Sequence, residues 1–260
     1  MPELFVRGRR IGHESNPADF DVTKTVILFV HGTGGDRDDW RSQLDDLSVP
    51  GSVIAMELPG HGISDPPGET TVSAYAEWVK GFVETLGLKR VVLVGCSLGS
   101  AITQWIAFGH KPWLFGVGLI GSGARLRVHP FILEGLIKEP SKTLQTLADY
   151  CLSNSSPDLL RNTIREKYGK SDPMTIHGDL SACDKFDVMN RLQEICVPTL
   201  VVVGAEDALT PVKYSKYLSE KIKPSSLVTI PGAGHLVMME KPDEFNAAIQ
   251  EFVDSLEKSV

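Results

Sequence analysis

The sequence predicts an α/β core domain in which a mostly parallel sheet carries helices on both of its sides. Along the 260 residues, short apolar segments that end at glycine or proline alternate with amphipathic segments. Short segments that are apolar throughout are typical of parallel strands buried on both faces. The alternation breaks once, between about residues 124 and 195, which predicts an insertion into that domain.

The apolar segments are predicted to be strands of one sheet. Two more polar segments within residues 4–15 are also predicted strands, which could pair as an antiparallel edge. The expected sheet therefore has eight strands, most of them parallel. The six apolar segments are 25–32, 52–60, 90–97, 114–122, 199–207 and 226–234.

Amphipathic segments between these strands are predicted helices. Residues 71–88 place their apolar side chains on one helical face, and Gly87 stands where such a helix would stop. Residues 242–259 show the same periodicity, with Pro242 near the first turn. The helical face of the first segment is formed by Val72, Tyr75, Val79, Phe82, Val83 and Leu86.

The segment that interrupts the alternation contains several short helical patterns and no strong strand pattern. It joins the strand predicted at 114–122 to the strand predicted at 199–207. We therefore expect residues 1–123 and 196–260 to form the core domain and residues 124–195 to form a helical cap. Such a cap would lie over the carboxyl edge of the sheet, where open α/β sheets bind ligands.

Composition excludes several classes of partner. The net charge is −7 and the basic residues are scattered, so there is no electrostatic reason to bind nucleic acid or an anionic membrane. No apolar run approaches the roughly 20 residues that span a bilayer, and the first residues lack the layout of a signal peptide. The cysteines show no CxxC spacing and are expected to be reduced thiols, which predicts a cytoplasmic protein. The cysteines are Cys96, Cys151, Cys183 and Cys196.

The segment "RVVLVGCSLGSAITQWIAF" (90–108) is typical of a strand, a tight turn and a helix. It contains the pattern G-x-S-x-G, with Gly95 and Gly99 on either side of Ser97. A nucleophile on such a strained turn brings the backbone close to the neighbouring strand and helix, and glycines two residues before and after it relieve the crowding. The pattern therefore predicts a nucleophilic serine.

The neighbouring Cys96 is the alternative nucleophile. A pattern centred on Cys96 would need glycines at positions 94 and 98, where the chain has Val94 and Leu98. Ser97 therefore takes the nucleophile position, and Cys96 is expected to pack as a small apolar side chain.

A serine hydroxyl needs a base, and the base needs an orienting acid. On this kind of sheet they follow in the order serine, acid, histidine. Asp207 and Glu206 end the strand at 199–207, and we favour Asp207 as the acid. His235 follows the last strand and precedes an amphipathic helix, so we expect it to be the base.

Other histidines compete with His235 for the role of base. His31 and His61 lie beside glycine in turns after strands, and we expect them to shape those loops. The remaining four lie outside any motif and are expected at the surface; they are His13, His110, His129 and His177.

The turn "HGTGG" (31–35) follows an apolar strand and is a candidate oxyanion-binding loop. Its glycines allow backbone N–H groups to turn toward a substrate. The N–H groups of Thr33 and Leu98 could together hold an oxyanion. The alternative is an ordinary turn between a strand and a loop.

Five motifs, in this order along the chain, resemble those of the α/β-hydrolase superfamily. The resemblance covers nearly the whole chain and is closest to capped esterases, enol-lactonases and carbon–carbon bond hydrolases. It implies Ser97 as nucleophile, Asp207 as acid and His235 as base, with the N–H groups of Thr33 and Leu98 as the oxyanion hole. The motifs are "HGTGG", "ELPGHGISD", "GCSLGS", "GAEDALTP" and "GAGH".

The function expected from these observations is hydrolysis of small carboxylic esters through an acyl-enzyme, with no cofactor and no metal. A lactonase or a carbon–carbon bond hydrolase with the same triad is an alternative, and a non-catalytic binding protein of the same fold is another. The substrate is expected to be a small acyl compound, and the sequence leaves the oligomeric state open. Candidate pocket residues are Phe131, Leu136, Leu209 and Leu236.

Overall fold

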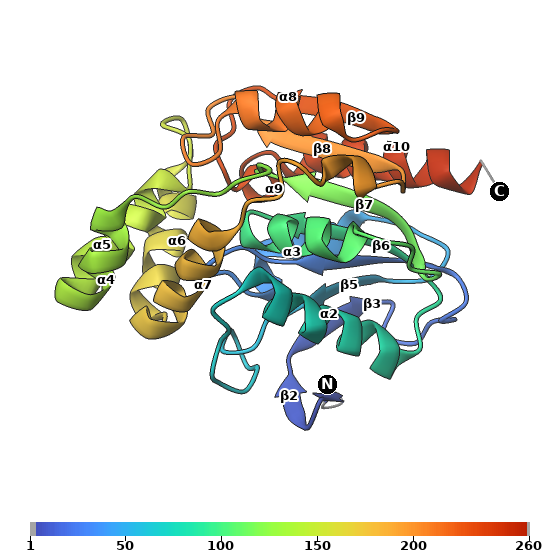
Figure 1. The fold of residues 1–260 in the computed structure, drawn as a ribbon, viewed down its shortest axis with the longest axis horizontal. Helices are drawn as coiled ribbons and strands as arrows, with labels where there is room; N and C mark the ends of the chain where they lie inside the picture. Colours follow the sequence, from blue (N-terminus) through green and yellow to red (C-terminus); the bar gives the residue numbers. More distant parts are fainter. Residues whose placement is uncertain (1–3, 259–260) are drawn as a thin grey trace.

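A mostly parallel sheet of seven strands forms the centre of the computed structural model, which describes residues 4–258 (Figure 1). The strand order is β3-β5-β4-β6-β7-β8-β9, and all neighbours are parallel except β3 and β5, which are antiparallel. The strands are β3 (His13–Asn16), β4 (Thr25–Val30), β5 (Val53–Met56), β6 (Arg90–Cys96), β7 (Leu114–Ile120), β8 (Thr199–Gly204) and β9 (Ser225–Ile230).

The prediction of eight strands in this sheet was wrong by one. Strands β1 (Leu4–Val6) and β2 (Arg9–Ile11) pair only with each other, as a separate antiparallel hairpin. Arg7 and Gly8 both have positive φ, 51° and 81°, which suits a two-residue hairpin turn and directs β1 back onto β2. The antiparallel edge of the main sheet therefore consists of β3, which pairs with β5, and the opposite edge is β9.

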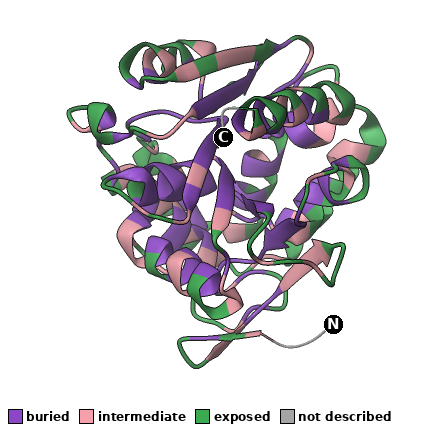
Figure 2. Ribbon diagram, turned by 90° about the vertical axis from the view of Figure 1, so that its right-hand side faces the viewer, coloured by how far each residue is buried: buried purple, intermediate pink, exposed green. Residues whose placement is uncertain are grey.

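Helices cover both faces of the sheet. Successive strand residues point to opposite sides, and because they are apolar on each side, both faces need to be buried. In β4, Leu28 joins one apolar cluster, whereas Ile27 and Phe29 join the other. The buried colour in Figure 2 is concentrated in the strands between the helical layers. The first cluster is covered by α2 (Val72–Leu86), α3 (Leu98–Ala107) and α8 (Val212–Lys221), and the second by α1 (Arg41–Asp46), α9 (Val237–Glu240) and α10 (Pro242–Glu257).

The two long predicted helices are confirmed. Helix α2 begins after Thr71, whose hydroxyl accepts from the Ala74 N–H, and it ends at Gly87 with φ of 68°. Helix α10 runs to Glu257, and position 259 of the predicted segment lies outside the described residues. The described residues also contain two single 3-10 turns, η1 (Arg37–Trp40) and η2 (Leu192–Glu194).

Between β7 and β8 the chain leaves the sheet and forms four helices at one end of it (Figure 1). The chain leaves and returns through adjacent segments, because Arg125 pairs with Asp187 and the Val188 N–H donates to the Ala124 carbonyl at 2.8 Å. We call these segments the neck. The helices are α4 (Pro130–Lys138), α5 (Pro140–Tyr150), α6 (Asp158–Lys170) and α7 (Pro173–Lys185).

Candidate active site

Ser97 lies on a strained turn between β6 and α3. Its backbone has φ of 54° and ψ of −115°, a region that residues with side chains rarely adopt. A Cβ atom on Gly95 would lie 2.1 Å from the Gly99 carbonyl oxygen, and a Cβ on Gly99 would lie 2.2 Å from the Val30 carbonyl oxygen. The two glycines are thus required by close backbone contacts, as the sequence pattern predicted.

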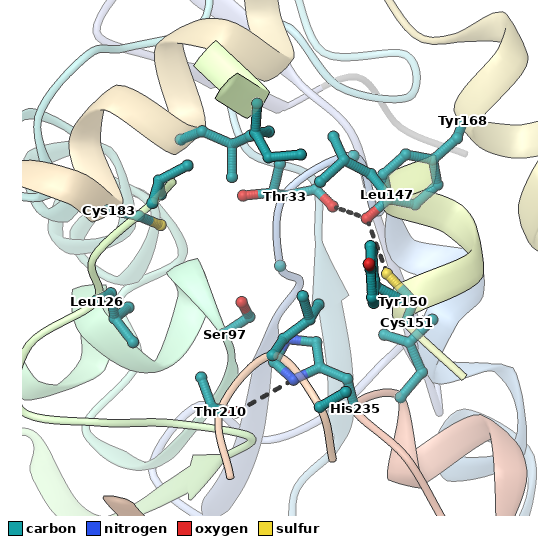
Figure 3. A pocket seen from close by; sticks show the side chains of 18 of the residues that line it. Thr33, Ser97, Leu126, Leu147, Tyr150, Cys151, Tyr168, Cys183, Thr210 and His235 are labelled. Carbon is teal, nitrogen blue, oxygen red and sulfur yellow. Dashed lines mark hydrogen bonds between the residues drawn. The ribbon is translucent and has the colours of Figure 1, made fainter. Parts of the chain in front are cut away.

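Cys96 does not share this position. Its side chain is fully buried in the apolar cluster on the second face of the sheet. Burial raises the pKa of the Cys96 thiol well above its usual value, so the thiol stays protonated. Ser97, in contrast, lines a cavity at the carboxyl ends of the strands, and Figure 3 shows its side chain among those that line it.

Asp207 and His235 come from the loops that follow β8 and β9. The Asp207 Oδ2 atom lies 2.9 Å from His235 Nδ1, and both side chains are buried. Glu206, the alternative acid, is exposed. Gly121 provides the space for the imidazole, because a Cβ there would lie 3.0 Å from His235 Nδ1. The structure therefore brings Asp207, and not Glu206, to the histidine.

Hydrogen-bond donors surround the Asp207 carboxylate. Oδ1 accepts from the N–H groups of Leu209 and Thr210, and Oδ2 accepts from the Thr210 hydroxyl at 2.7 Å as well as contacting His235. Burial alone would raise the pKa of Asp207, but the charge and hydrogen bond of His235 and the Thr210 donors lower it below its ordinary value. Asp207 is thus kept as a carboxylate that orients the ring.

Thr210 was not among the site residues predicted from the sequence. Its hydroxyl also lies 3.2 Å from His235 Nδ1, so it contacts both the acid and the ring (Figure 3). The signal was its place three residues after Asp207, a spacing at which a carboxylate commonly accepts from the following backbone.

Ser97 and His235 line the same cavity, which has a volume of about 540 Å³. Within residues 4–258, neither Ser97 Oγ nor His235 Nε2 is hydrogen bonded to another protein group, while Nδ1 is held by Asp207. This leaves one ring nitrogen able to accept a proton and one hydroxyl able to attack. Hydrogen bonds between such groups commonly tighten only when substrate is bound.

The loop after β4 lies against the serine. A Cβ atom on Gly32 would lie 3.1 Å from the Ser97 Cβ atom, so the loop and the turn are in close contact. In the described part of the chain, the N–H groups of Thr33 and Leu98 have no hydrogen-bond acceptor. Leu98 also begins α3, whose N-terminus carries the positive end of the helix dipole. Both N–H groups are thus unpaired in the loop and the turn that meet at Ser97, and their role as an oxyanion hole is a proposal.

His31 holds the orientation of this loop. Its Nε2 accepts from the Leu58 N–H at 2.9 Å, so its Nδ1 carries the proton and donates to the Gly32 carbonyl at 2.7 Å. Burial and the neighbouring His61 lower the pKa of His31 to about 3, which keeps the ring neutral. Because C=O and N–H of one peptide point in opposite directions, fixing the Gly32 carbonyl also fixes the Thr33 N–H.

A second histidine–carboxylate pair lies away from this cavity. His61 Nε2 is 2.9 Å from Asp179 Oδ2 on α7, and the Tyr75 hydroxyl donates to the other oxygen at 2.5 Å. Burial lowers the pKa of His61, but the charge of Asp179 outweighs it and raises the pKa above its ordinary value. This ion pair attaches α7 to the loop after β5, a loop-shaping role for His61.

Three of the four candidate pocket residues line the cavity: Phe131, Leu209 and Leu236. Leu136 does not. It is 2% exposed and packs in the apolar cluster where α4 meets α5 and α7, because it lies on the inward face of the amphipathic α4. Further apolar side chains of the cavity come from α5 and α6, among them Leu147 and Ile164.

Within residues 4–258, no group of three or more histidine, cysteine, aspartate or glutamate side chains could hold a metal ion. No helix of that part of the chain is both long and apolar enough to cross a membrane.

The chain belongs to the alpha/beta hydrolase family, whose profile matches residues 27–248. The match confirms the membership predicted from the five sequence motifs. It supports hydrolase activity on a small-molecule substrate.

Particular relatives are consistent with this family. The chain is 35% identical to a thermophilic esterase of known structure, with a TM-score of 0.84 over 98% of this chain and 97% of that chain. It is 27% identical to the pimeloyl-[acyl-carrier protein] methyl ester esterase of Neisseria meningitidis, over 91% of this chain and 78% of the relative.

A third relative is longer than this chain. It is the dihydrolipoyllysine-residue acetyltransferase component of the acetoin cleaving system of Cupriavidus necator, and the sequences are 28% identical over 238 residues. The match includes 87% of this chain but only 63% of that relative's length.

Proposed function

We propose that the protein is a serine hydrolase that cleaves small carboxylic esters through an acyl-enzyme. The observation that carries the proposal is the buried Asp207–His235 pair, at 2.9 Å, in the cavity that also contains the strained Ser97. The similarity to two esterases supports the choice of an ester over other hydrolysable bonds.

In the proposed reaction, Ser97 Oγ attacks the ester carbonyl carbon while His235 Nε2 takes the hydroxyl proton. The carbonyl oxygen becomes an oxyanion, which accepts hydrogen bonds from the N–H groups of Thr33 and Leu98. The carbon–oxygen bond to the alcohol then breaks, and His235 gives its proton to the leaving oxygen. Water activated by His235 attacks the acyl-enzyme, releasing the acid and restoring Ser97.

We further propose that residues 124–195 act as a cap that selects the substrate. Helices α4, α5 and α6 contribute apolar side chains to the cavity, including Phe131, Leu147 and Ile164. Core loops contribute Leu209 and Leu236. These apolar side chains favour an uncharged acyl or alcohol group beside them, because a charged group there would lose hydration without gaining a partner.

A panel of p-nitrophenyl esters of increasing acyl length, run beside a matched panel of lactones, tests the proposed activity. We expect turnover of the esters and stoichiometric labelling of Ser97 by a fluorophosphonate probe. Faster turnover of lactones would favour the lactonase alternative. Absence of both labelling and turnover would favour a non-catalytic binding protein.

The activity is expected to rise with pH and then level off, because the base acts as a neutral imidazole and cannot accept a proton once it is protonated. Asp207 does not supply this change, since its pKa is lowered below the ordinary value for aspartate. His31 does not supply it either, because its pKa is about 3. The measurement is kcat/KM against pH, with circular dichroism at each pH to detect unfolding. A flat profile, or an active His235→Ala variant, would contradict the role of His235.

Phe131→Ala should shift the preference among acyl chains toward longer or bulkier groups, because it removes a ring from the wall of the cavity. Leu136→Ala is the matched control on the same helix. It should cost about 2–5 kcal/mol of stability and leave the preference unchanged, since Leu136 is buried outside the cavity. The ratios of kcat/KM across the ester panel measure the effect. Identical ratios in Phe131→Ala and the wild type would mean that Phe131 does not contact the acyl group.

A further inference from the structure

Tyr168 of α6 contacts the loop of the proposed oxyanion hole directly, and it is connected to the loop of the proposed base through Cys151. Its hydroxyl donates to the Thr33 carbonyl at 2.8 Å and lies 3.3 Å from Cys151 Sγ (Figure 3). We propose, on the basis of the proposed ester hydrolysis, that Tyr168 is a positioning residue, which fixes the oxyanion loop relative to the histidine loop.

On the side of the oxyanion loop, the bond to Thr33 complements the bonds to Gly32. His31 and the Gly35 N–H already hold the Gly32 carbonyl, which fixes the peptide that carries the Thr33 N–H. Tyr168 holds the next carbonyl along the chain. The two peptides that flank the Thr33 α-carbon are therefore both fixed, one by the core and one by α6.

The residue before Tyr168 strengthens this attachment. Lys167 Nζ lies 2.7 Å from Asp36 Oδ1 and 2.5 Å from Asp39 Oδ1, and Asp39 is buried. Both carboxylates follow directly after the oxyanion loop. Consecutive residues of α6 thus hold the carbonyl of Thr33 and the segment that comes after it.

On the other side, Cys151 links Tyr168 to the base. The Cys151 carbonyl accepts from the N–H groups of both His235 and Leu236, each at 3.1 Å. Burial raises the pKa of the Cys151 thiol to about 12, so the thiol is protonated and can donate to the Tyr168 oxygen. This direction agrees with the single hydroxyl proton of Tyr168 going to Thr33.

A second set of bonds ties the same segment to the histidine loop. Glu240 accepts from the Gly234 N–H at 2.7 Å and from the Ser153 N–H at 2.8 Å, and it also accepts from the Ser156 hydroxyl. The segment after α5 is therefore held firmly against the loop of His235. Tyr168, which contacts both Cys151 and the Thr33 carbonyl, connects this segment to the oxyanion loop.

The position of Tyr168 suits this role. Its side chain is 7% exposed, and burial raises the pKa of the phenol well above its usual value, so the hydroxyl keeps its proton. Gly34, with φ of 69°, packs on the Tyr168 ring, since a Cβ atom at Gly34 would lie 3.2 Å from the ring carbons Cε1 and Cζ. The ring thus supports the loop by packing, and its hydroxyl sets the direction of the Thr33 carbonyl.

Tyr168→Phe keeps this packing and removes only the hydroxyl. We expect kcat on an activated ester to fall about 10- to 100-fold, as happens when catalytic groups are slightly misplaced. KM should stay within about twofold, because the oxyanion hole acts on the transition state and not on the bound ester. Affinity for benzeneboronic acid, which forms a tetrahedral adduct with the serine, should fall in parallel with kcat.

Tyr217→Phe on α8 is the matched control, because Tyr217 is half-buried and lies outside the cavity. Its thermal unfolding reports the cost of a tyrosine hydroxyl that has no role at the site. If Tyr168→Phe does not fold, Cys151→Ala takes its place. It should lower kcat about threefold or more, the value of one ordinary hydrogen bond, with KM unchanged.

Ser97→Ala, assayed in parallel, separates the two proposals. If Ser97→Ala keeps its activity, the proposed function fails. If Ser97→Ala is inactive while Tyr168→Phe keeps the kcat and the boronic acid affinity of the wild type, the proposed function stands and the role of Tyr168 is overturned. A rise in KM with unchanged kcat would likewise overturn it, since Tyr168 would then act only on ground-state binding.

Discussion

Ser97→Ala should abolish ester turnover, with a loss in kcat of up to about 10⁶, as when comparable nucleophiles are removed. The hydroxyl is the group that would form the acyl-enzyme, and no other side chain occupies its strained position between Gly95 and Gly99. The measurement is kcat on one activated p-nitrophenyl ester, with folding checked by circular dichroism.

Cys96→Ala is the control for this experiment. Its thiol is fully buried and protonated, so its removal should cost some stability and at most a modest factor in rate. Inhibition by thiol reagents would not decide between the two residues, because a bulky group on Cys96 would disturb the neighbouring turn. A folded Ser97→Ala variant that hydrolyses the ester, together with an inactive Cys96→Ala variant, would make the cysteine the nucleophile.

Asp207→Asn should lower kcat on the order of 10⁴, as for the comparable acid of serine proteases. All four groups that contact the Asp207 carboxylate can donate to it: two backbone N–H groups, the Thr210 hydroxyl and His235 Nδ1. Asparagine has only one oxygen, and its NH₂ group would face one of these donors. The imidazole would then lose the acceptor that holds its proton on Nδ1, so Nε2 could not act as the base.

Glu206→Gln is the matched control, since Glu206 is the adjacent carboxylate and is exposed. Its kcat should stay close to that of the wild type. The result that would reject our assignment is a crippled Glu206→Gln variant beside a nearly normal Asp207→Asn variant. Thermal unfolding of both variants would show whether the loss of a buried acceptor also lowers stability.

Much of the core could be predicted because its determinants are local. Strand β4 is apolar on both faces since helices cover both, and Gly87 ends α2 through its positive φ. The glycines around Ser97 are required because a side chain at either position would clash with the backbone of the adjoining strand and helix. Patterns of this kind are visible in a single sequence because each residue's constraint lies within a few positions of it.

The remaining features depend on distant contacts. The bond from Tyr168 to Thr33 joins residues 135 positions apart, and that from Asp179 to His61 joins residues 118 apart. Tyr168 and Asp179 stand in none of the sequence motifs. The error over Leu136 has a similar origin, because apolar periodicity does not distinguish the helical face that meets other helices from the face that lines a cavity.

Because of the neck, the four-helix segment begins and ends at neighbouring points beside the sheet. Because the chain departs near Ala124 and returns near Val188 through paired backbone, a segment of different length or sequence could replace it without disturbing the strand order. Such an exchange would replace all the cavity-lining side chains of these helices together, and could thereby change which substrates fit. It would also remove Tyr168, so a transplanted segment would have to bring its own donor for the Thr33 carbonyl or accept slower catalysis.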